Sequence, residues 1–71
     1  MIYAQFAGLL YDPQDTNRAI GRVMHFDVDY LSDIDDLPQL PTLNTGGGSS
    51  IWCAETDEDF IMMSDGWKKQ L

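Results

Sequence analysis

The chain has 71 residues, of which 12 are acidic and four are basic, giving a net charge of −8 at neutral pH. This length corresponds to one small domain with a modest core. The acidic balance argues against binding to nucleic acid or to an anionic membrane, because both need lysine and arginine. Hydrophobic residues make up 44% of the chain, which is too many for a disordered acidic tail.

Neither a disulfide, a metal nor a cofactor is expected to stabilise the chain. Cys53 is the only cysteine and His25 the only histidine, whereas a structural zinc site needs about four such ligands. The glycines at 46–48 precede an apolar strand and no lysine follows closely, so they do not predict a phosphate-binding loop. Small domains without these devices gain stability by oligomerising, and docking on a larger partner serves the same end.

The first 30 residues are predicted to form an antiparallel β hairpin. Residues 2–11 are rich in aromatic and branched side chains, which favour strands. A run of turn formers follows, and from Met24 to Tyr30 apolar residues alternate with polar ones. This period of two is typical of a strand with one buried and one solvated face, so residues 19–30 are expected to be the second strand.

Residues 31–49 are predicted to connect the hairpin to the rest of the chain. Ser32 favours the start of a single helical turn as its N-cap, and Asp33, Asp35 and Asp36 suit the positive end of the helix dipole. A proline then ends the turn, and three glycines predict a flexible loop.

Residues 50–71 are predicted to form a C-terminal β unit. Two short apolar strands, 51–54 and 60–63, flank a polar turn, and Asp65-Gly66 is a strong signal for a tight turn before a last short strand. The sequence thus predicts a single, mainly β domain: a small antiparallel sheet or barrel-like domain of about five short strands with one short helical turn.

No enzymatic activity is predicted from the two side chains best suited to catalysis. His25 falls on the polar side of its strand, with no serine or cysteine beside it in the sequence, which favours an ordinary surface residue. Cys53 lies close in sequence to Glu55, Asp57 and Glu58, whose charges disfavour a reactive thiolate. Cys53 is therefore expected to be a packed, inert thiol.

The C-terminal β unit carries more large apolar side chains than one face of a small sheet can bury. Some of them are expected to cover a partner, with the acidic run as a second contact. The expected partner-binding residues are Trp52, Phe60, Met62, Trp67, Asp33, Asp35 and Asp36.

Short motifs follow one another in a fixed order between residues 36 and 69. They are Asp36-Leu37-Pro38, Gly48-Ser49, the two apolar strands around Thr56-Asp57, and Asp65-Gly66-Trp67-Lys68. This order resembles a short β unit of tailed-bacteriophage structural proteins, which occurs in small head and tail proteins and in some head-fibre proteins. The resemblance implies a non-enzymatic virion protein, made in the host cytoplasm, that docks on capsid, neck or tail proteins or on copies of itself.

A second hypothesis is an acidic DNA mimic that inhibits a host DNA-binding enzyme. The net charge of −8 and the run of carboxylates from Asp27 to Asp36 motivate it. The stretch Glu55-Thr56-Asp57-Glu58, followed by an apolar strand, is also loosely similar to inhibitors of uracil-DNA glycosylase.

Overall fold

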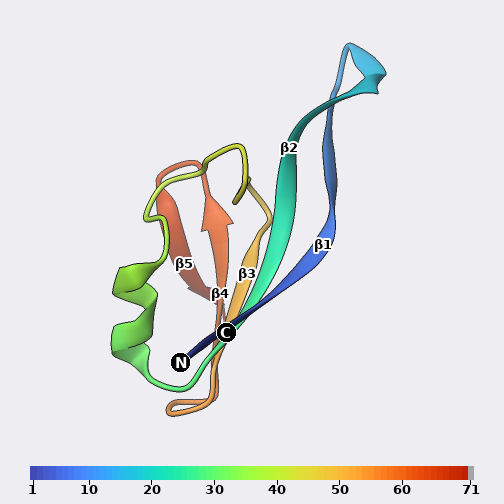
Figure 1. Cartoon of the computed structure of the whole chain (residues 1–71). Helices are drawn as coiled ribbons and strands as arrows, with labels where there is room; N and C mark the ends of the chain where they lie inside the picture. The colour runs from blue at the N-terminus through green and yellow to red at the C-terminus, as the bar shows by residue number, and fades with distance from the viewer. Residues whose placement is uncertain (71) are drawn as a thin grey trace.

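The computed structural model describes residues 1–70, which form one five-stranded sheet and one short 3-10 helix (Figure 1). The strands are β1 (Ile2–Asp12), β2 (Asp15–Val28), β3 (Ser50–Cys53), β4 (Glu58–Met63) and β5 (Gly66–Gln70), and the helix is η1 (Leu31–Asp36). The mainly β fold with five strands and one helical turn is therefore confirmed. β1 and β2 are longer than the short strands expected, at 11 and 14 residues.

The strands follow one another across the sheet in chain order, with β1 and β5 at its edges. Neighbouring strands are antiparallel except β2 and β3, which run parallel from the pair His25 and Ser50 to the pair Val28 and Cys53. The sheet is thus mixed, whereas the sequence indicated an antiparallel one. A parallel pair needs a long crossover connection, and residues 29–49 provide it.

Two tight turns lie where the sequence indicates them. Asp12 pairs with Asp15, so two residues join β1 to β2, and Met63 pairs with Gly66, so two residues join β4 to β5. Gly66 has a φ of 119°, a backbone conformation that side chains with a Cβ rarely adopt. The Asp65-Gly66 turn signal is therefore confirmed.

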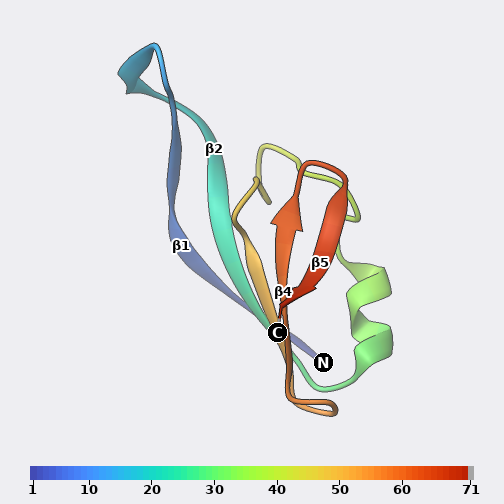
Figure 2. The ribbon, with the colours of Figure 1, turned by 180° about the vertical axis from the view of Figure 1, so that it is seen from behind.

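One face of the sheet carries the core, and η1 with the loop behind it covers this face (Figures 1 and 2). The alternation in β2 predicts the buried face correctly as far as Val28, and Tyr30 is 58% exposed because the strand has ended before it. Cys53 is 0% exposed, which confirms a packed thiol. The core cluster consists of Phe26, Val28, Ile34, Leu37, Ile51 and Cys53.

Trp67 contacts both the sheet and the covering layer, which consists of η1 and the loop after it. Its ring meets that of Phe26 edge to face, with centroids 6.3 Å apart. Its indole Nε1 donates a hydrogen bond of 2.9 Å to the carbonyl oxygen of Pro38, just after η1. An indole buried on one side and hydrogen-bonded at its polar end stabilises both layers at once.

The glycine-rich loop was expected to be flexible, but hydrogen bonds hold it on both sides. The Gly46 amide donates to the carbonyl of Arg22 over 2.7 Å, and the Gly48 amide donates to that of Met62 over 3.0 Å. Ser49 is fully buried, and its hydroxyl accepts a bond of 3.0 Å from the Met24 amide. Because these polar groups of the loop are hydrogen-bonded, the loop is a fixed part of the folded body.

An ion pair between β4 and β5 makes part of the stability depend on pH. Lys69 Nζ lies 2.8 Å from Glu58 Oε2 and, by donating to it, holds the pKa of Glu58 below its ordinary value of 4.5, with help from Thr56. Because the folded pKa is lowered, this stabilisation is present above the ordinary value and is lost as the pH falls through the lowered one. We expect wild type to melt slightly above Glu58→Gln at neutral pH, and the difference to vanish in strong acid.

Thermal melts followed by circular dichroism across the acidic range would measure this difference. Asp59→Asn serves as the control, since Asp59 also lies on β4 and makes no ion pair within residues 1–70. A Glu58→Gln difference that persisted unchanged into strong acid would contradict the assignment.

Candidate functional site

The hairpin of β1 and β2 projects far beyond the rest of the sheet (Figure 1, upper right). β3 pairs with β2 only from His25 onward. Residues 6–22, here called the hairpin arm, therefore pair only within the β1–β2 hairpin. Among the described residues of the arm, Arg22 alone also forms backbone hydrogen bonds outside the hairpin, with Leu43 and Gly46 of the loop after η1. The arm makes the molecule 40 Å long and 20 Å wide. Register shifts after Phe6 and after Leu10 add twist, which turns the arm away from the body.

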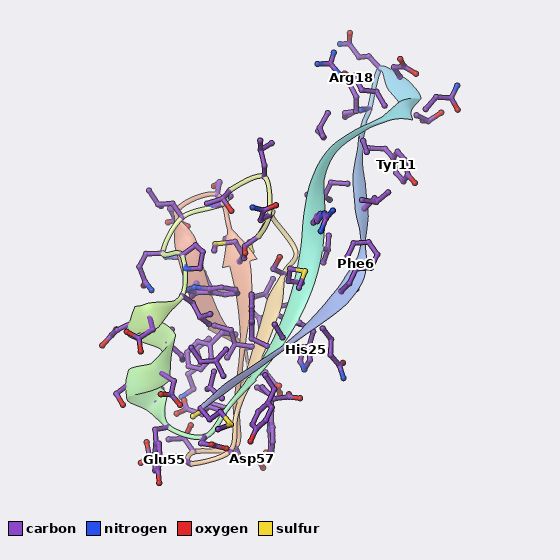
Figure 3. All side chains as sticks on the ribbon, in the orientation of Figure 1. Phe6, Tyr11, Arg18, His25, Glu55 and Asp57 are labelled. Carbon is purple, nitrogen blue, oxygen red and sulfur yellow. The ribbon has the colours of Figure 1, made fainter. Side chains whose placement is uncertain are left out.

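Large apolar side chains on the arm are exposed to solvent (Figure 3). The exposed fractions are 58% for Phe6, 42% for Leu9, 50% for Tyr11 and 43% for Ile20. A two-stranded ribbon is only marginally stable alone, and its unpaired edges are a template for another chain. These features together mark the arm as a surface for protein contact. Strand patterns in the sequence did not reveal it, because they do not show whether a strand has a neighbour.

A cleft of about 550 Å³ opens between the arm and the loop after η1. Both arginines of the chain, Arg18 and Arg22, line it. The guanidinium of Arg22 also lies 5.9 Å from the centre of the Phe6 ring, a cation–π contact. Neither arginine makes an ion pair with a carboxylate in the part of the chain that is described. The apolar lining consists of Leu9, Ala19, Ile20, Gly21 and Leu43.

The free arm should be the least protected part of the sheet. We expect amides between Gly8 and Gly21 to exchange with deuterium on the order of 100-fold faster than those of β3, because the arm can open without disturbing the core. Hydrogen exchange followed by NMR in dilute solution measures this directly. The Arg22 amide donates a 2.8 Å bond to the Leu43 carbonyl. It is therefore the internal control and should exchange more slowly than the other arm amides. Protection of the arm equal to that of β3 would contradict this description.

The other face of the sheet is open and holds a chain of three polar side chains. His25 Nδ1 lies 2.7 Å from Ser50 Oγ, and His25 Nε2 lies 2.8 Å from Asp27 Oδ1. The sequence missed this set, because His25 and Ser50 are 25 positions apart and meet only through the parallel pairing of β2 and β3. His25 is partly exposed on this face, and both of its ring nitrogens lie within hydrogen-bond distance of a neighbouring side chain.

These are the residue types of a serine nucleophile with its base and orienting carboxylate. Acyl transfer also needs a pocket and donors for the oxyanion. Here the three side chains lie on one sheet face, with His25 and Ser50 at paired positions of β2 and β3, and the cleft lies elsewhere, at the arm. Ser50 and His25 are a register pair of the parallel strands and are also joined side chain to side chain.

The predicted apolar contact residues separate onto the two faces of the sheet. Trp52 lies on the open face, 37% exposed, with its Nε1 donating to Asp57 Oδ1 over 2.9 Å. Phe60 and Trp67 are partly buried against the core, and Met62 is 1% exposed. Met62 is therefore a core residue that a partner docking on the folded chain does not reach.

The predicted acidic contact residues also have different surroundings. Asp33 is bound from two sides: its carboxylate accepts from the N-terminal amine over 3.0 Å and from the Tyr30 amide over 3.1 Å. These bonds hold its pKa below the ordinary value, the amine having the larger effect. Tyr30, not Ser32, is the residue that precedes η1. Asp35 and Asp36 are exposed.

Comparisons with protein-family models, with curated proteins and with solved structures give no significant match for this chain. Within residues 1–70, no group of three or more potential metal ligands is gathered in one place. The same part of the chain has no helix long and apolar enough to cross a membrane.

Proposed function

We propose that this chain is a non-catalytic structural or accessory protein that joins a larger particle by docking its hairpin arm on a neighbouring protein. The observation that carries the proposal is the arm itself: four large apolar side chains, 42–58% exposed, on a ribbon without flanking strands. The motif order between residues 36 and 69 supports the setting of a tailed-bacteriophage particle, on the capsid, neck or tail.

Two kinds of contact are available to the arm. Its backbone edges can pair with a strand of the neighbour, as in β-augmentation, and its apolar side chains can fill a groove. The body would remain folded as a rigid base, because Trp67 and the glycine-rich loop close its core independently of the arm tip. Docking would also order a ribbon that is marginal alone, which adds an entropic cost but lets the contact be reversible.

Quantitative mass spectrometry of purified particles tests this setting. The chain is expected in the particle fraction at a constant ratio to the major structural proteins after repeated gradient purification. Recovery only in the soluble fraction would overturn the proposal.

The acidic DNA mimic remains the second candidate function, and one contact favours it. The Leu31 amide donates to Glu55 Oε1 over 3.1 Å, which places the acidic β3–β4 turn beside the start of η1. Purified uracil-DNA glycosylase is the probe, and inhibition should weaken at high salt and in Asp35→Asn/Asp36→Asn. No inhibition at an excess of the chain would eliminate this candidate for that enzyme.

A further inference from the structure

We propose that the cleft beside the hairpin arm receives the acidic β3–β4 turn of a second copy of this chain, so that copies associate head to tail. This inference rests on the proposed function, because it names the partner of the arm. It is carried by two sets of unmatched charges at opposite ends of one elongated molecule, and by the cleft that holds one of them.

The receiving end carries two arginines that form no ion pair within residues 1–70. Arg18 and Arg22 line a cleft of about 550 Å³, together with apolar side chains. Asp12 and Asp15 at the arm tip match the arginines in number, but neither forms an ion pair with Arg18 or Arg22 within residues 1–70. Guanidinium groups beside apolar walls bind carboxylates well, because partial removal of water strengthens the pair.

The inserted end is the turn that joins β3 to β4, residues 54–57. Figure 3 shows Glu55 and Asp57 at the end of the molecule opposite Arg18. One oxygen of each carboxylate accepts a neutral N–H, from the Leu31 amide and from the Trp52 indole. Neither carboxylate pairs with a cation within residues 1–70. Each therefore keeps an oxygen for an arginine from outside.

The remaining positive charges cannot serve the same purpose. Lys68 pairs with Asp65 over 3.1 Å, and Lys69 pairs with Glu58 over 2.8 Å. The arm holds two acidic and two basic residues, so the whole net charge of −8 belongs to the rest of the chain. The arm is thus the part of one copy that the acidic body of another attracts most strongly.

Cleft and turn lie on different surfaces of the molecule, so the contact is heterologous. Such contacts close into rings or continue as filaments, depending on the rotation between copies. A short turn in an open cleft makes a small interface, and small interfaces are weak and reversible. Association is therefore expected to depend on concentration and on salt.

Sedimentation velocity of the full chain over a concentration series at one low ionic strength tests the inference. The arm variant is Arg18→Glu/Arg22→Glu, and the turn variant is Glu55→Arg/Asp57→Arg. Each is expected to associate at least about tenfold more weakly than wild type, because like charges then meet at the junction. An equimolar mixture of the two should associate again, since each junction regains opposite charges.

Two controls separate this contact from general effects of charge. The turn variant is less negative overall than wild type, so its loss of association cannot come from increased repulsion. Lys68→Glu/Lys69→Glu makes the chain as negative as the arm variant does but leaves the cleft unchanged. This control should therefore associate more strongly than the arm variant. Circular dichroism checks that each variant is folded. If the arm variant is unfolded, the turn variant alone still tests the contact between the cleft and the β3–β4 turn.

Several results would overturn head-to-tail association. They are a wild-type chain that stays monomeric throughout, variants that associate like wild type, or a mixture that stays dissociated although both variants are folded. A monomeric wild-type chain that is nevertheless found in purified particles would overturn this inference and leave the proposed docking function standing. Absence from particles would overturn the docking function instead.

Discussion

Replacing Ile51 with alanine is expected to lower the free energy of unfolding by about 2 to 5 kcal/mol. Ile51 is 0% exposed and lies at the centre of the core face, paired with Phe26 on one side and Phe60 on the other. The substitution removes buried methyl groups and leaves a cavity that the surrounding strands cannot close. A domain of this size has a total stability of roughly 4 to 10 kcal/mol, so this loss is a large share of the total and should lower the urea midpoint strongly.

The matched control for this substitution is Ile20→Ala on the hairpin arm. Ile20 is 43% exposed and lies outside the core, so the same chemical change should alter stability by about 0.5 kcal/mol or less. Urea unfolding followed by tryptophan fluorescence would measure both variants. Equal losses for the two variants would show that the arm and the body form one continuous core, which contradicts the exposure of Ile20.

Replacing Gly66 with alanine is expected to cost about 2 kcal/mol or more. The φ of 119° is unfavourable for any residue with a Cβ, and a Cβ at this position would lie 2.8 Å from the backbone carbonyl oxygen of Gln39. That carbonyl adjoins Pro38, whose own carbonyl accepts the indole bond of Trp67. Displacing it should therefore loosen the covering layer as well as the β4–β5 turn.

Two other glycines separate the causes of this effect. Gly48 also has a positive φ, of 88°, but a Cβ there would meet nothing within 4 Å. Gly48→Ala thus measures backbone strain alone, and Gly47→Ala, with open space and no positive φ, should be nearly neutral. Thermal melts are expected to rank Gly66→Ala lowest, then Gly48→Ala, then Gly47→Ala. A Gly66→Ala variant as stable as Gly47→Ala would contradict the close approach to Gln39.

Local patterns in the sequence predicted the local structure of this chain well. The alternation around Phe26 and Val28 identified the buried face of β2, and Asp65-Gly66 identified the last hairpin turn. These signals work because side-chain direction and turn conformation depend on neighbouring residues. The burial of Cys53 followed from the same reasoning.

Features that depend on distant parts of the chain could not be predicted in this way. A period of two does not tell whether a strand pairs parallel or antiparallel, so the pairing of β2 with β3 was missed, and with it the meeting of His25 with Ser50. The exposed side chains of Phe6 and Tyr11 look like ordinary strand residues until the arm is seen to lack a neighbouring strand. The candidate site depends on these long-range features.

The most direct test of the account is the fraction of the chain that sediments with purified particles after substitutions on the arm. The double variant Phe6→Ser/Tyr11→Ser should be folded but lost from the particle fraction. The control Tyr3→Ser/Met63→Ser removes side chains of similar exposure, 53% and 48%, from outside the arm and should sediment like wild type. A Phe6→Ser/Tyr11→Ser variant that sediments with the particles as wild type does would contradict docking through the hairpin arm.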